Sequence, residues 1–275
     1  IKSESDMFLL QQDINNVVEW SNQNLLPINE SKCRLMVFAK NKSRFDTIQY
    51  TVGGTVLTPQ SEVKDLGVVF DSKLSFDNHI SSITSDAYRI LGFVIRSSHS
   101  FRNLNTMILI YNAFVRSKLE YASTVWHRHV GSHGDKLEKV QKKFLRYLHY
   151  RKYGIYPHYD KHPVRTRDMQ LDFNILSLQN RRHLNDAVFT YRILNYLIDC
   201  PDLLSRFNLH VPSRRTRQTH KIFSFPVLTS RLNSPLSRCM NLLNNLCANQ
   251  ELDLFSMSLN DFKKRAMEYL LSSHT

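Results

Sequence analysis

Glycine and cysteine are both scarce in this sequence, and their scarcity excludes several classes of protein. Only 7 of the 275 residues are glycine, and neither a phosphate-binding loop nor a dinucleotide-binding fingerprint is present. The 4 cysteines include no Cys-x-x-Cys pair, so the spacing typical of structural zinc sites is missing as well. We interpret the cysteines as reduced thiols of an intracellular protein, and we expect no metal site in the chain.

Long apolar runs are also missing, and acidic residues are too few to balance the basic ones. No stretch approaches the roughly 20 apolar residues that span a bilayer, and no signal peptide opens the chain. Lys and Arg number 37 against 24 Asp and Glu, a formal net charge of +13. An excess of this size favours nucleic acid rather than a membrane as the partner, and we expect the protein in the cytoplasm and nucleus.

The first 75 residues combine one helix with short strands. Apolar residues three and four positions apart predict a helix over residues 7–20. Short runs rich in strand-forming residues follow it. The expected strands are residues 34–40, 48–52, 55–58 and 63–70. Gly53-Gly54 separates the second run from the third, and a two-residue Gly-Gly link is typical of a β-hairpin.

From Phe76 onward the apolar spacing is that of helices. The clearest amphipathic segment is residues 135–150, with an apolar face opposite a face of lysines and one arginine. Further helices are expected at 80–94, 104–115, 168–199 (two helices), 201–207, 236–248 and 258–272. Residues 211–235, which hold three prolines, are interpreted as a loop or arm. The predicted fold class is therefore α+β and predominantly α.

Several segments in a fixed order resemble the region downstream of the active site in reverse transcriptases of non-LTR, Jockey-like retrotransposons. The segments are residues 10–38, 63–80, 111–129 and 137–148, followed by Arg181-Arg182 and residues 200–204. Within the first, the Trp, Asn, Leu, Asn and Lys-Cys pattern resembles polymerase motif D. The Lys-Asp-Leu-Gly-Val sequence of the second resembles the motif E hairpin, which grips the primer.

The resemblance implies a domain organisation and two groups of site residues. Residues 1–75 correspond to a palm remnant, 76–150 to a helical thumb and 151–275 to a basic helical C-terminal extension. Lys32 matches the motif D lysine, which assists departure of pyrophosphate and is a candidate catalytic residue. Its alternative is an ordinary surface lysine. Leu66, Gly67 and Val68 match the primer-grip turn, and the alternative there is a core strand with a bulge.

Basic residues in the second half of the chain form the predicted nucleic-acid-binding set. Cations of one sign on a helix face neutralise phosphates and give salt-sensitive binding that is independent of base sequence. The set comprises Lys136, Lys139, Lys142, Lys143, Arg146, Arg151, Lys152, Arg181, Arg182, Arg214, Arg215 and Arg217. Tyrosines are interleaved with the cations between residues 147 and 159, and they can stack on unpaired bases or serve in packing. A solvated helix face is the alternative for the charged stripe.

The chain is not expected to polymerise on its own. Polymerases hold two divalent metals on paired carboxylates, and this sequence contains no Asp-Asp pair. Because the first residue is Ile1, we interpret the chain as a fragment whose upstream part carries those carboxylates and binds Mg²⁺. By resemblance the partners are an RNA template, a DNA primer and the upstream polyprotein. Three alternatives remain open: a domesticated, non-catalytic nucleic-acid-binding protein, a helical interaction module, and the product of a truncated pseudogene. Trp20, Tyr111, Tyr121 and Trp126 are expected to pack in cores.

Overall fold

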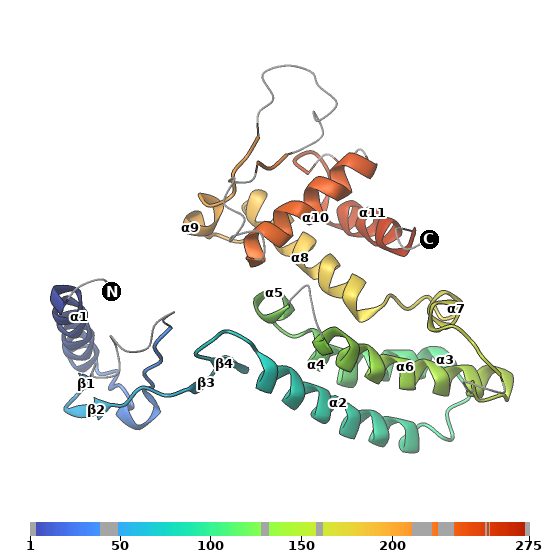
Figure 1. Ribbon diagram of the computed structural model, residues 1–275, viewed down its shortest axis with the longest axis horizontal. Helices are drawn as coiled ribbons and strands as arrows, with labels where there is room; N and C mark the ends of the chain where they lie inside the picture. The colour runs from blue at the N-terminus through green and yellow to red at the C-terminus, as the bar shows by residue number, and fades with distance from the viewer. Residues whose placement is uncertain are drawn as a thin grey trace. The chain divides into compact units, whose positions relative to one another are not determined.

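The computed structural model describes residues 4–38, 49–127, 132–157, 162–210, 222–224, 234–250, 252 and 254–272. The chain divides into two compact units, residues 1–79 (unit 1) and 80–275 (unit 2). Helices predominate in the described residues, and the strands among these residues form two antiparallel pairs (Figure 1). The predicted fold class is confirmed. The division into palm remnant, thumb and extension stays a prediction, since unit 2 holds most of the expected thumb and the whole extension.

Unit 1 contains α1 and two hairpins. Its elements are α1 (Glu4–Gln23), the 3-10 turn η1 (Glu30–Lys32), β1 (Tyr50–Val52), β2 (Thr55–Leu57), β3 (Glu62–Asp65) and β4 (Val68–Asp71). The β1–β2 hairpin turns at Gly53 and Gly54, whose φ angles of 58° and 99° are those that glycine adopts most easily, as predicted. The side chain of Gln11 bonds to both the N–H and the C=O of Thr51 at 2.9 Å, which fastens α1 to β1.

Two expectations for residues 4–38 are wrong. The strand predicted over 34–40 is reduced, in its described part, to one bridge between Leu35 and Pro59, because Pro59 has no N–H with which to extend a ladder. Residues 39–48 lie outside the described ranges. Trp20 is not a core residue either, since 58 % of its surface is exposed on α1.

The single strand predicted over 63–70 is also wrong, because β3 and β4 are two strands of a hairpin. Leu66 and Gly67, with φ angles of 43° and 86°, reverse the chain so that Asp65 pairs with Val68. After β4, the Asp71 carboxylate accepts hydrogen bonds from the backbone N–H groups of Lys73, Ser75 and Phe76. This loop leads directly into the next helix.

The helices that follow pack around two cores. They are α2 (Asp77–Ser97), α3 (Leu104–Tyr111), the π-helical η3 (Asn112–Arg116), α4 (Ser117–Glu120), α5 (Ser123–Trp126), α6 (Ser132–Tyr153), α7 (Thr166–Asp172), α8 (Leu178–Leu194), α9 (Pro201–Leu204), α10 (Pro235–Gln250) and α11 (Leu259–Ser272). Tyr111 stacks on Phe144 of α6 with ring centroids 4.1 Å apart. Both are fully buried, as is Trp126, whereas Tyr121 is 57 % exposed, contrary to expectation.

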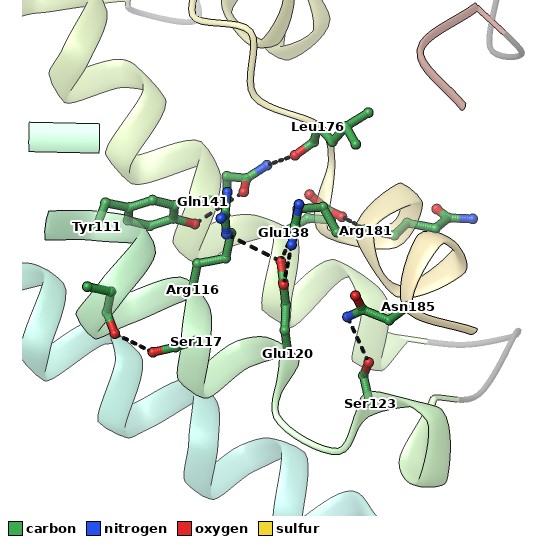
Figure 2. Close-up of polar contacts among 12 residues, drawn as sticks. Tyr111, Arg116, Ser117, Glu120, Ser123, Glu138, Gln141, Leu176, Arg181 and Asn185 are labelled. Carbon is green, nitrogen blue, oxygen red and sulfur yellow. Dashed lines mark hydrogen bonds and ion pairs between the residues drawn. The ribbon is translucent and has the colours of Figure 1, made fainter. Parts of the chain in front are cut away.

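α8 links the two cores of unit 2. Its apolar residues pack with α10 and α11, while its N-terminal turns lie against α4, α5 and α6. Gln141 of α6 connects the two sides, since it accepts a hydrogen bond from the Tyr111 hydroxyl at 3.2 Å and donates one to the Leu176 carbonyl at 2.9 Å (Figure 2). None of the helices in the described ranges is long and apolar enough to cross a membrane.

A buried ionic network joins α5, α8 and α10. Arg238 of α10 donates from Nε to Asp186 Oδ2 at 2.8 Å and from Nη2 to the Thr124 carbonyl at 3.1 Å. Its Nη1 also donates to the carbonyl of His127, whose ring Nδ1 lies 3.3 Å from Asp186 Oδ2. Asp186 is 0 % exposed and Arg238 is 5 % exposed, so neither charge is solvated if its partner is removed.

The substitution Asp186→Asn should destabilise unit 2 by about 3–5 kcal/mol, because it leaves the Arg238 guanidinium buried without its counter-charge. The free energy of unfolding, measured in urea by circular dichroism, tests this. Asp172→Asn is the matched control, since Asp172 pairs with Lys152 near the surface and should cost less than about 1 kcal/mol. Equal effects of the two substitutions would contradict the central role of Asp186.

Acid should destabilise the same network. The pKa of His127 lies below its usual 6.5, because burial disfavours the protonated ring by more than Asp186 stabilises it. Burial alone would raise the pKa of Asp186, but hydrogen bonds and charge from His127 and Arg238 outweigh burial and lower that pKa below 3.8. Both folded pKa values are below the unfolded ones, so the unfolded state binds more protons as the pH falls.

The stabilisation that this buried network gives to the folded state is therefore complete above about pH 6.5. It is lost on acidification, first as His127 is protonated and then as Asp186 is protonated. Thermal unfolding midpoints between about pH 8 and pH 4 should fall with pH. In a His127→Gln variant the fall near neutral pH should be smaller, and His79, whose pKa burial also lowers, should account for part of what remains. A midpoint that stays level, or a variant with the wild-type profile, would contradict this account.

Candidate nucleic-acid interface

α6 separates its residues into a buried face and a basic face. Leu137, Val140, Phe144, Leu145 and Leu148 are each at most 1 % exposed, as the sequence predicted. On the opposite side Lys136, Lys139 and Lys143 are exposed, and Lys142 and Arg146 are half-buried. These five residues are called the basic stripe. It extends for about 15 Å along the helix, at a rise of ~1.5 Å per residue.

The cations of the basic stripe are not neutralised within the described part of the chain. No ion pair there involves any of the five, and the one aromatic contact is Lys143 Nζ over the ring of Tyr88 of α2, 5.7 Å from its centroid. Five positive charges within three helical turns repel one another, and a polyanion relieves that repulsion. The geometry therefore suits contact with consecutive phosphates.

Arg151 and Lys152, at the end of α6, have partners within the protein. The Arg151 guanidinium donates to the Ser98 carbonyl at 3.0 Å and to the Tyr147 hydroxyl at 2.9 Å, which holds the segment after α2 against α6. Lys152 forms an ion pair with Asp172 of α7. A contact of either residue with nucleic acid stays a prediction.

Arg181 and Arg182 lie on α8 and do not join the basic stripe. Arg181 makes a two-pronged ion pair with Glu120 of α4, from Nε and Nη2, and Arg116 lies 3.6 Å from the same carboxylate (Figure 2). Arg182 is only 3 % exposed, and burial lowers the pKa of its guanidinium. The structure gives both arginines packing positions, and their binding of nucleic acid stays a prediction. Arg214, Arg215 and Arg217 lie outside the described residues.

The candidate residues of unit 1 lie at turns. Lys32 is exposed at the end of η1, directly before the chain becomes extended at Cys33. Leu66 is 83 % exposed at the tip of the β3–β4 hairpin, and Val68, in the strand pair next to the turn, is 3 % exposed. A hairpin is the geometry that the resemblance to motif E implies. The roles of Lys32 and of the hairpin tip stay predictions.

A metal site does not fit the described residues. Nowhere among them do three or more His, Cys, Asp or Glu side chains gather as metal ligands would. His127 has the carboxylate neighbour that the sequence did not indicate, Asp186, but Arg238 occupies the same carboxylate. We therefore assign no step of metal chemistry to the described residues.

Curated proteins similar to this chain are RNA-directed DNA polymerases of mobile elements. One is the polymerase of the mobile element jockey from Drosophila funebris, which is 30 % identical over 169 residues, covering 60 % of this chain and 17 % of the relative. The jockey polymerase of Drosophila melanogaster is 25 % identical over 176 residues, covering 62 % of this chain and 18 % of the relative. The resemblance to Jockey-like, non-LTR reverse transcriptases is thus confirmed.

The chain spans less than a fifth of the length of these two relatives. No protein-family model matches the chain. No solved structure matches it either. The similarity is therefore one of sequence to part of a reverse transcriptase, and the activity, substrates and partners of the whole enzyme are matters for proposal.

The substitution Gly67→Ala should open the β3–β4 hairpin, because an L side chain at a φ of 86° costs about 1–3 kcal/mol. Faster amide hydrogen exchange in β3 and β4 would report the loss. Gly92→Ala in α2 is the control. Its new Cβ would meet only the flexible end of Arg96, at 3.4 Å, so it should stabilise by up to about 1 kcal/mol. Unchanged exchange in the Gly67 variant would show that the turn does not depend on glycine.

Proposed function

We propose that this chain is the post-catalytic part of a Jockey-like reverse transcriptase and that it grips template–primer nucleic acid through the basic stripe of α6. Two observations support the proposal. The sequence is similar to the jockey polymerases, and five cations on one helix face form no ion pair with any residue that the structure describes. The second observation carries the binding role, since it does not depend on the name of any relative.

The mode of binding follows from the chemistry of the stripe. Lysine ammonium groups contact phosphate oxygens as point charges and do not read base edges, so the affinity should depend little on base sequence. A rigid helix backed by a fully buried face holds the charges in place, which reduces the entropy lost on binding. In the parent enzyme this surface would hold the RNA template and the DNA primer while another segment performs chemistry.

Polymerisation is assigned to that other segment. Phosphoryl transfer on a growing primer requires carboxylates that hold two metal ions, and this sequence has no Asp-Asp pair. In the parent enzyme Mg²⁺ would be bound by the upstream part. Lys32 would then act from unit 1 as a general acid or point charge near the pyrophosphate. On its own the chain would bind nucleic acid and not extend a primer.

Salt dependence tests the proposal. Each phosphate contact steepens the plot of log affinity against log salt by about 0.9 in duplex DNA, so replacing Lys136, Lys139 and Lys143 by Ala should reduce the slope by about 2–3. The measurement is fluorescence anisotropy of an RNA–DNA hybrid with the full chain. Affinity should also be similar for hybrids of unrelated sequence.

The matched control removes three cations from another helix. Lys263, Lys264 and Arg265 lie on α11, and replacing them by Ala changes the net charge by the same amount. The control should leave the slope almost unchanged. An equal loss in both triple variants would mean that net charge, not the stripe, causes binding. Absence of binding at low salt would favour a helical interaction module instead.

A further inference from the structure

The exposed face that carries the basic stripe continues beyond its last cation. Lys136, Lys139, Lys143 and Arg146 are followed on the same face by Tyr150 and Tyr153, at successive spacings of three and four residues. Tyr150 is 46 % exposed and Tyr153 is 50 % exposed. One face of α6 therefore carries cations over its first turns and aromatic rings over its last turns.

A turn at the end of α6 adds a third ring. Gly154, with a φ of 72°, donates its N–H to the Tyr150 carbonyl at 2.8 Å and ends the helix in a left-handed cap. The chain then folds back, with the Ile155 carbonyl 3.1 Å from His149 Nδ1. As a result the ring of Tyr156, 49 % exposed, lies 6.3 Å from the ring of Tyr150.

The ring of Tyr153 is held in place by polar contacts. The Tyr153 hydroxyl donates to Asp172 Oδ2 at 3.1 Å, and Lys152 Nζ, also paired with Asp172, lies 5.0 Å from the centre of the Tyr153 ring. The ring of His149 also lies close to that of Tyr153, with ring centroids 4.7 Å apart and planes tilted by 46°. A ring fixed in this way loses little conformational entropy when a flat ligand stacks on it.

We propose that Tyr150, Tyr153 and Tyr156 form a stacking platform for the unpaired bases of a single-stranded extension whose backbone lies along the basic stripe. This inference rests on the proposed function. Charge complementarity selects the ligand, since the platform directly continues four cations and a polyanion with flat apolar faces matches both parts. The platform would thus bind the strand where a template–primer duplex gives way to unpaired template.

The experiment compares two RNA–DNA hybrids, one blunt and one with a single-stranded RNA extension, bound to the full chain. The extension should raise the affinity of the wild-type chain about ten-fold, as expected for stacking of one or two bases. In the double variant Tyr150→Ala, Tyr156→Ala this gain should disappear. The affinity for the blunt hybrid and its salt slope should not change, because no phosphate contact is removed.

Two further variants make the test specific. Tyr150→Phe with Tyr156→Phe keeps the rings and should keep the gain. Tyr196→Ala removes an exposed tyrosine just beyond α8, 77 % exposed, and should also keep it. The stacking platform is ruled out if the Ala double variant keeps the gain in affinity from the extension, or if the Phe double variant loses it equally. Neither result would bear on the role proposed for the basic stripe. If the wild-type chain bound the blunt hybrid with an affinity that does not depend on salt, that result would instead overturn the proposed function.

Discussion

The arrangement of unit 2 depends on a carboxylate that has no access to water. Asp186 of α8 receives the Arg238 guanidinium from α10, and Arg238 also binds the carbonyls that end α5. A charge buried in this way is stable only while all of its partners are present, so the three helices must assemble together. α6 is in turn tied to α8 and to the segment before it by Glu138, which accepts the Gln179 N–H at 2.7 Å, and by Gln141.

The acidic side chains around α8 explain why the basic stripe has no partners among the described residues. Glu120 is occupied by Arg181, Asp186 by Arg238, and Glu138 by the first turn of α8. All three carboxylates bind donors on α8 or α10, and the pair between Asp186 and Arg238 is buried. The lysines on the opposite face of α6 form no ion pair with the described residues. Three carboxylates close to α6 and α8 are therefore paired elsewhere, and the positive charge of the basic stripe remains for a polyanion.

Local periodicity was sufficient to predict the parts of the fold that depend on neighbouring residues. The Gly53-Gly54 hairpin and the two faces of α6 were predicted because their patterns repeat within one turn or one strand. The reversal at Leu66 was implied by the resemblance to the motif E hairpin, but the apolar pattern runs through it and predicted one strand, because a leucine at positive φ is uncommon. The positions of Arg181 and Arg182 were unpredictable from their neighbours. The partner of Arg181, Glu120, is 61 residues away, and only the packing of α4 on α8 brings them together. Trp20 was placed in a core on residue type alone, which does not determine exposure.

The π-helical segment η3 has a consequence for how this region tolerates change in length. Met107, Tyr111, Val115 and Leu119 are spaced four residues apart and are all 0 % exposed. In a regular α-helix, residues at that spacing drift by about 40° per step, and the stripe would rotate off the core. The wider turn at Asn112–Arg116 compensates for the drift and keeps the stripe straight. Removing one residue here would restore a regular helix and rotate Leu119 and everything after it by about 100°. The segment therefore fixes the rotation of α4 relative to α3, and with it the position of Glu120 opposite Arg181. For this reason we expect homologous chains to differ in length at other segments.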